Sequence, residues 1–409
     1  MALTPNRIEP LNKQEPNNFA YIDAVRGLAF LAVLIVHAAL SVGQFYGRSI
    51  LAKGGYGVQL FFLASAITLC FSMAARQRID AHPVIYFYVR RLFRIAPLFW
   101  LAILFYSLFP GVMPAFWLSQ WAPDGVRPSY FALTACFLHG WHPYTFNSIV
   151  PGGWSIAVEM TFYAIFPFLY RFLSLSFKNT TVVVLTAFVC LKIGSHMFPY
   201  LQRHLFPEVP ANVWSFFVDL WFPSQLPIFL IGFLAYHLLC NDSIRGMVKV
   251  RFWAVCSLCF CCMLLLSILR GYSGFVPGFL IVGLILGAII IVISEEAVPW
   301  LVNRPIRYIG KISYSCYLVH FAALGLTLKL FGVHLSADLT SFDTGNQFSN
   351  FVLFEKISTI ALVVTVAIST VTLHLIENPG IAVGRRIIRR MSDLSCRSAN
   401  SRNFATGSL

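Results

Sequence analysis

The first apolar segment of the chain contains an arginine and a histidine eleven residues apart, Arg26 and His37. In a helix this spacing is about three turns, so both side chains project from one face with an axial separation of about 16 Å. A fixed positive charge and an imidazole, which titrates near neutral pH, can together bind an anion and move a proton. The alternative is structural, with Arg26 paired to Asp23 at i, i+3 and His37 held in a satisfied polar contact.

A second group of charges lies in residues 88–97, where Arg91 and Arg94 are three residues apart. Side chains at this spacing share a helical face, and two guanidinium groups suit the bidentate binding of phosphate oxygens. A phosphate-bearing ligand in the cytosol is one interpretation. Each arginine taken singly is also typical of the basic anchors that flank membrane helices on the cytoplasmic side.

Residues 151–159 place one carboxylate, Glu159, inside an apolar helix that starts near Trp154 and Ser155. A carboxylate about a turn and a half inside such a helix is costly unless it has a partner or a function, and we favour a function. Trp154 suits either the interfacial aromatic belt or a platform for a sugar ring. The belt is the simpler interpretation.

The polar side chains of a late segment include Ser313, Tyr314, Tyr317 and His320. Three of them, Ser313, Tyr317 and His320, fall at helical spacing on one side. His320 can therefore meet His37 in a common polar cavity, or it can make an ordinary hydrogen bond between helices.

The elements that carry these residues are apolar helices. Of the 409 residues, 58% are apolar and 11% are charged, and the mean hydropathy is +0.74, whereas soluble domains have about 25% charged residues. The apolar residues form long blocks, so the sequence predicts an all-α, polytopic integral membrane protein whose partner is the lipid bilayer. We expect about ten spanning helices, at 20–43, 55–75, 95–110, 154–173, 181–199, 223–240, 252–269, 273–294, 312–332 and 353–375.

The short segment 131–139 cannot cross a bilayer and is expected to be re-entrant or interfacial. The positive-inside rule supports ten spans, because this count puts 21 of the 30 Lys and Arg residues on the cytoplasmic side and 7 outside. Both termini are then cytoplasmic. Residues 1–19 form a polar N-terminal tail, 20–379 the membrane domain, and 380–409 a basic tail that we expect to be disordered. Glu377, at the cytoplasmic edge of the last span, is expected to pair with a basic loop.

The basic residues lie in short loops and not in one basic domain, which argues against nucleic-acid binding. Among the cysteines only Cys256, Cys259, Cys261 and Cys262 cluster. The cluster lies in an apolar run with no nearby histidine or carboxylate, so we expect a packing role and no metal site. The sequence assigns no oligomeric state.

These segments, in this order, resemble the type 3 membrane acyltransferase family, the integral-membrane O-acyltransferases that modify bacterial surface glycans. The resemblance extends over residues 21–379. Arg26 and His37 match the family's signature of arginine, ten residues and histidine. Gln59 departs from the pattern, because many members have aspartate there, so no acid role carries over to this position. The other matching residues are Gly57 to Phe62, Arg91, Arg94, Trp154, Ser155, Glu159, Ser313, Tyr314, Tyr317, Leu318 and His320.

The resemblance implies that an acyl group, usually acetyl, passes from cytosolic acyl-coenzyme A to a sugar hydroxyl at the inner membrane of a bacterial cell. Acyl-coenzyme A is then a co-substrate, and no tightly bound cofactor is expected. Arg91 and Arg94 are implied to dock the donor phosphates. His37 is implied to be a general base or a transient acyl carrier, and Arg26 to steer the donor or stabilise the oxyanion. Glu159 is implied to bind the acceptor or to orient an imidazole. The polar cavity would be completed by Trp154, Ser155, Ser313, Tyr314, Tyr317 and His320.

Two other functions fit the same polar residues. Intramembrane arginine, histidine and glutamate also form proton relays, as in a secondary transporter or a glycan flippase. Such transporters often have repeated halves, and the sequence has no visible internal repeat. In a third interpretation, a membrane scaffold, the buried polar groups only fix the packing of helices.

Overall fold

The computed structural model of the chain describes residues 19–112, 120–122, 125–241, 278–295, 300–333 and 344–406. The described residues form helices and the turns between them, with no β-strand among them. Within these ranges seven helical segments are long and apolar enough to cross a membrane. The elements in chain order are α1 (Ala20–Leu40), α2 (Arg48–Leu51), η2 (Ala52–Tyr56), α3 (Gly57–Arg76), α4 (Pro83–Leu108), η3 (Pro110–Val112), α6 (Pro128–Ala135), η4 (His139–Trp141), α7 (Gly153–Leu173), α8 (Phe177–Ser195), α9 (Phe198–Leu205), α10 (Ala211–Leu220), α11 (Phe222–Leu239), α14 (Gly278–Glu295), α15 (Arg304–Lys311), α16 (Ser313–Leu330), α17 (Gln347–Thr372), η5 (Leu373–Glu377) and α18 (Asn378–Thr406).

The all-α, polytopic class predicted from the sequence agrees with this architecture. Nine of the ten predicted spans fall on a helix of the structure. The tenth, at 252–269, lies outside the described residues, as does the cysteine cluster within it. Helix α6 has 8 residues, and a helix of this length rises only about 12 Å. The segment 131–139 is therefore too short to cross a bilayer as a helix.

Helix α4 differs from the prediction at its start. The hydropathy pattern predicts a span at 95–110, whereas the helix begins at Pro83. Proline suits the first helical positions because its missing N–H would have no partner there. The basic residues that follow are good helix formers, although their charge hides the helix from a hydropathy profile. Arg91 and Arg94 therefore lie in the interior of α4 and not beside its start.

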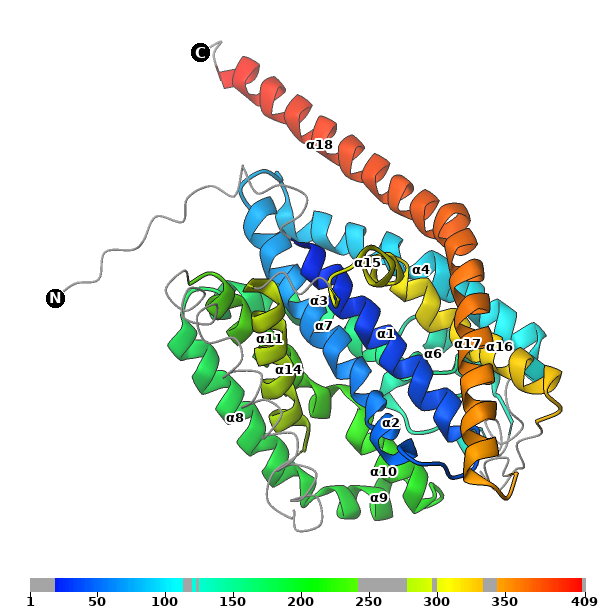
Figure 1. Cartoon of the computed structure of the whole chain (residues 1–409). Helices are drawn as coiled ribbons and strands as arrows, with labels where there is room; N and C mark the ends of the chain where they lie inside the picture. The colour runs from blue at the N-terminus through cyan, green and yellow to red at the C-terminus, as the bar shows by residue number, and fades with distance from the viewer. Residues whose placement is uncertain are drawn as a thin grey trace.

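The C-terminal segment is helical, so the expectation of disorder at 380–409 is wrong for its described part. Helix α18 packs along α4, as Figure 1 shows. A side chain at Gly384 would meet the Phe93 side chain, and His82 Nε2 lies 3.1 Å from Ser395 Oγ. Arginine is a good helix former, and α4 supplies a surface for the apolar side of α18, which together outweigh the serine-rich composition.

Helix α1 lies at the centre of the bundle, where it contacts α3, α15, α16 and α17 (Figure 1). Two glycines allow α15 to approach it closely. A Cβ at Gly310 would overlap the backbone oxygen of Asp23, and one at Gly27 would overlap that of Ile306. Because α15 leads directly into α16, this close contact sets where α16 begins along α1.

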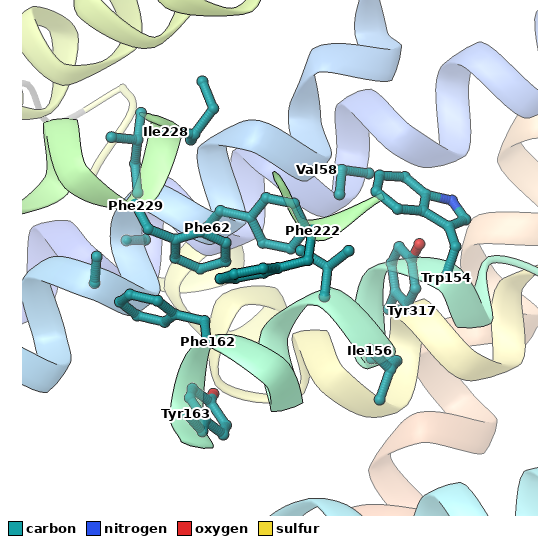
Figure 2. Packing of buried hydrophobic residues seen from close by; sticks show 14 of the residues in the cluster. Val58, Phe62, Trp154, Ile156, Phe162, Tyr163, Phe222, Ile228, Phe229 and Tyr317 are labelled. Carbon is teal, nitrogen blue, oxygen red and sulfur yellow. The ribbon is translucent and has the colours of Figure 1, made fainter. Parts of the chain in front are cut away.

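A stack of aromatic rings fills the interior between α3, α7 and α11, as Figure 2 shows. Phe229 stacks on Phe62 and on Phe162, with ring centroids 4.7 Å and 4.0 Å apart. Because lipid is as apolar as these rings, their contribution within a membrane is close packing and not removal from water. The stack fixes the spacing between α3 and α7, both of which also line the cavity described below.

Replacing Gly310 by alanine is expected to destabilise the protein, because the added methyl group overlaps the backbone of α1. Overpacking of this kind costs about 1–3 kcal/mol. The measurement is the thermal unfolding midpoint of protein purified in detergent. Gly55→Ala is the control, because nothing lies within 4 Å of a Cβ at Gly55. Equal midpoints for the two variants would contradict the close contact.

Candidate active site

A cavity lies among α1, α3, α4, α7 and α16 and contains about 610 Å³ of space outside the protein atoms. Its lining combines guanidinium, carboxylate, hydroxyl and apolar groups. The lining residues are Arg26, Val58, Phe61, Phe62, Ser65, Arg91, Arg94, Ile95, Ser155, Ile156, Glu159, Tyr163, Ser313, Tyr314 and Tyr317.

Three guanidinium groups face this cavity, from Arg26 on α1 and from Arg91 and Arg94 on α4. Arg26 Nη2 donates to Thr68 Oγ1 at 3.4 Å. The ion pairs in the described part of the chain do not include one between Arg26 and Asp23. The ion pair with Asp23 that the structural interpretation of Arg26 requires is therefore not found.

Arg91 is held by aromatic rings. Its guanidinium carbon lies 5.7 Å from the Phe87 ring centroid and 5.5 Å from that of Tyr163, within the range of a cation–π contact. Its Nε is buried and has no hydrogen-bond partner among the described residues. The neighbouring Arg90 instead donates to Asp80 Oδ2 at 2.7 Å. Of these consecutive arginines, one anchors a loop and the other presents an unused donor beside the cavity.

Glu159 supplies the carboxylate among the residues that line the cavity. Its Oε1 accepts hydrogen bonds from Ser65 Oγ at 2.5 Å and from the Tyr163 hydroxyl. Three guanidinium groups thus face one carboxylate, which leaves an excess of positive charge. A cavity with this lining is suited to an anionic ligand.

Two tyrosines of α16 connect the cavity to the neighbouring helices. The Tyr314 hydroxyl donates to Ile95 O on α4 at 2.7 Å. The Tyr317 hydroxyl donates to Gly152 O at 3.0 Å and accepts from Ser155 Oγ at 2.8 Å. These bonds fix one wall of the cavity to α4 and to the start of α7.

His37 and His320 lie side by side but do not belong to the cavity lining. Their ring centroids are 5.5 Å apart. Tyr317 lines the cavity, and its ring centroid lies 5.5 Å from that of His320, so the histidine pair adjoins a residue of the cavity wall. The two histidines meet, as one interpretation of the sequence has it, but they do not share one cavity with Arg26.

Trp154 does not line the cavity either. Only 8% of its surface is exposed, and its ring lies edge-on to Phe62 with centroids 6.1 Å apart. Figure 2 shows it beside Val58. An interfacial belt residue would face the lipid headgroups, so the belt interpretation of Trp154 is wrong.

The start of α7 is held by a largely buried connection, residues 139–152. His139 Nε2 donates to Gly153 O at 2.9 Å, and Asn147 Oδ1 accepts from the Gly152 N–H at 2.9 Å. Gly152 has a φ of 72°, in the left-handed region that favours glycine. Non-helical backbone is tolerated in membrane proteins where protein covers it, and here it positions the first turn of α7.

Glu377 is buried in η5, a single π-helical turn. It accepts a hydrogen bond from Ser315 Oγ, which also receives one from Thr372 Oγ1 at 2.9 Å. The expected salt bridge to a basic loop is absent from the described residues. A buried hydroxyl network occupies this carboxylate instead.

Sequence analysis does not identify Ser65 and Tyr163, which hold Glu159 in place. Tyr163 follows Glu159 by four residues, so the i, i+4 spacing is a signal that points to it. Ser65 lies among apolar residues of α3 with no local signal, because its partner is on another helix. His139 also has no local signal, since its role depends on the fold of the connection before α7.

The fold and the site together define a class of protein: a polytopic helical membrane protein with a cationic cavity beside a pair of histidines. A family model described as an acyltransferase domain matches residues 19–376. The chain therefore belongs to the acyltransferase 3 family and is an enzyme that transfers acyl groups. It is similar to a Streptomyces mycarofaciens protein named acyltransferase MdmB, with 25% identity over 355 residues that cover 78% of this chain and 83% of the relative. No solved structure matches the chain.

Lowering the pH is expected to destabilise the protein partly through His139. Burial lowers the pKa of this imidazole to about 4, because the charged form is poorly solvated there. Between pH 6.5 and 4 the unfolded chain binds a proton that the folded chain excludes. Stability is therefore complete above pH 6.5 and is lost as the pH falls, by about 2 kcal/mol at pH 5.

The measurement is the unfolding midpoint at pH 7 and pH 5 for the wild type and for His139→Gln, whose amide can still donate to Gly153 O. The glutamine does not titrate, so the fall in midpoint should be smaller in the variant. An equal fall in both proteins would show that His139 is not buried as a neutral ring.

Proposed function

We propose that the protein transfers a short acyl group from acyl-coenzyme A, on the cytoplasmic side, to a hydroxyl group of a saccharide. We choose acyl-coenzyme A as the acyl donor because the cavity is positively charged: its lining includes three guanidinium groups and one carboxylate. Coenzyme A carries several phosphate charges, and guanidinium–phosphate contacts are charge-assisted and often bidentate. Arg91 lines the cavity and its buried Nε has no hydrogen-bond partner among the described residues, which supports a ligand that accepts from this side chain.

The arrangement along α1 suits a donor that is anionic at one end and reactive at the other. Arg26 and His37 lie on one helix, about 16 Å apart along its axis. In acyl-coenzyme A the pantetheine arm separates the phosphates from the thioester. When the phosphates bind at Arg26, Arg91 and Arg94, the arm extends past Tyr317 and brings the thioester to His37.

His37 is the general base in this proposal. Its imidazole removes the proton from the acceptor hydroxyl as the oxygen attacks the thioester carbonyl carbon. The carbon–sulfur bond then breaks, and the departing thiolate takes the proton from His37. An ester and free coenzyme A result, and the imidazole returns to its starting state.

The surroundings of Arg26 and Glu159 favour one of the two roles considered for each. Arg26 lines the same cavity as Arg91 and Arg94, which supports donor binding over stabilising an oxyanion near His37. Glu159 also lines that cavity, away from the histidines. Its position supports contact with a substrate over orientation of an imidazole.

The proposed acceptor and the proposed cellular location are inferred from the family resemblance. Enzymes that resemble this chain modify bacterial surface glycans, so we propose a saccharide acceptor and the inner membrane of a bacterial cell. The distribution of Lys and Arg supports a cytoplasmic location for the arginine end of α4. The saccharide hydroxyl then reaches His37 from the outer side.

Replacing His37 by alanine is expected to lower acyl transfer about 10²–10⁴-fold, the range that a general base contributes. The assay supplies membranes that contain the protein with labelled acetyl-coenzyme A and surface glycan from the same cell. His196→Ala is the matched control, because this histidine is exposed at the end of α8. Unimpaired transfer by His37→Ala would refute the assignment of the base.

Replacing Arg91 and Arg94 together by alanine is expected to raise the KM for acetyl-coenzyme A at least about 10-fold, because hydrogen bonds to charged groups contribute about 1.5–3 kcal/mol. Arg90→Ala is the control. It also removes positive charge from the same helix, one charge instead of two, but Arg90 pairs with Asp80 and does not line the cavity. If Arg90→Ala raises the KM as much as the double variant does, general electrostatics and not phosphate docking explains the effect.

A further inference from the structure

We infer that His320 positions His37 by accepting a hydrogen bond from its ring N–H. This inference rests on the proposed function, in which His37 is the base. It gives His320 a specific role, the orientation of the His37 ring, where the sequence implied only that His320 helps to line a polar cavity.

The first observation concerns the tautomer of His320. Its Nδ1 lies 2.7 Å from the backbone oxygen of Tyr317. A carbonyl oxygen only accepts hydrogen bonds, so Nδ1 carries the hydrogen in the neutral ring. The other ring nitrogen, Nε2, therefore presents a lone pair. The bond from Nδ1 fixes the orientation of the His320 ring, and Nε2 can accept a hydrogen bond.

The second observation is that this lone pair is buried without a partner. His320 is 0% exposed, and its Nε2 has no hydrogen-bond partner among the described residues. Buried polar atoms are paired in nearly all native structures, and an unpaired one requires an explanation. We therefore expect a hydrogen-bond donor to approach the Nε2 atom of His320 during the reaction.

The third observation identifies that donor. The ring centroids of Phe30, Phe321, Tyr317 and His37 lie within 6.0 Å of that of His320. Phenylalanine has no donor, and the Tyr317 hydroxyl already donates to a backbone oxygen. Among these rings His37 is left as the one with an available N–H.

The His37 ring is free to take up this bond. It is only partly buried, and the hydrogen bonds of the described residues include none to its ring nitrogens. The ring centroids of His37 and His320 are 5.5 Å apart and the ring planes meet at 36°, so the two rings are close neighbours, and the inference requires a rotation of the His37 ring about χ2 that brings an N–H to Nε2. Such a bond would fix which nitrogen of His37 faces the acceptor hydroxyl.

Neither Glu159 nor Glu377 is placed to take this orienting role. Glu159 is held by Ser65 and Tyr163, and Glu377 by Ser315. A base that is oriented by a third group is a general feature of acyl-transfer sites, and here the third group is an imidazole. During turnover the acceptor proton moves to the free nitrogen of His37 and then to the thiolate, while His320 keeps its own proton on Nδ1.

The test compares His320→Leu, which has no acceptor, with His320→Gln, whose amide oxygen can accept. We expect His320→Leu to lower kcat about 100-fold, within the contribution of a well-placed base, and to leave the KM for acetyl-coenzyme A within about two-fold. His320→Gln should retain at least about ten times more activity than the leucine variant. Equal kcat values for the leucine and glutamine variants, or a raised KM with unchanged kcat, would overturn the inference.

A double variant separates this role from a packing role. If His320 acts through His37, then His37→Ala combined with His320→Leu should be no slower than His37→Ala alone. A further loss in the double variant would show that His320 acts independently. Rates are referred to folded protein isolated by size exclusion in detergent, and methionine, which fits irregular spaces, replaces leucine if the leucine variant does not fold.

The experiments distinguish a failure of the proposed function, in which His37 is the base, from a failure of the role inferred for His320. An active His37→Ala enzyme would remove the proposed function together with this inference. An inactive His37→Ala enzyme beside a fully active His320→Leu enzyme would leave the proposed function intact and refute the role of His320 alone.

Discussion

The repulsion among three guanidinium groups inside a helical membrane bundle is the constraint on which the site depends. Taking a charge out of water costs several kcal/mol unless partners compensate for it. Here the compensation comes from aromatic rings around Arg91, from the Thr68 hydroxyl at Arg26, and from Glu159, which two hydroxyls fix in place. Positive charge still remains in excess among the residues that line the cavity, which is the basis for proposing an anionic ligand there.

Helix α1 connects the two chemical regions of the molecule. It presents Arg26 to the cationic cavity and His37 to the histidine pair, and its glycine contacts with α15 determine where α16 starts. Tyr317 of α16 lines the cavity, lies beside His320 and is anchored to the buried connection before α7. In the proposed function, the alignment of these three elements decides whether a donor bound by the arginines can present its thioester to His37.

Much of the arrangement could be predicted because the apolar blocks and the rare polar residues within them are local signals. The positions of most helices, the shared face of Arg91 and Arg94, and the importance of Glu159 follow from such signals. The predictions for Trp154 and for the C-terminal segment failed for the same reason. Trp154 is a core residue and not a belt residue, and residues 380–406 form a helix, because each packs against a partner distant in the sequence. A hydropathy profile contains no information about such partners.

The sequence by itself determined that the chain is a bundle of apolar helices and which ionisable residues lie within them, since inserting a charge into lipid is costly and such residues stand out in an apolar helix. It also carries the motifs by which the family is recognised. Only the tertiary structure decided that the arginines and Glu159 share a cavity, that His37 and His320 form a pair outside its lining, and that Tyr317 contacts both. Those relations depend on the axial offsets between helices, which are set by glycine contacts and ring packing across the whole bundle and not by the spacing of residues along any one helix.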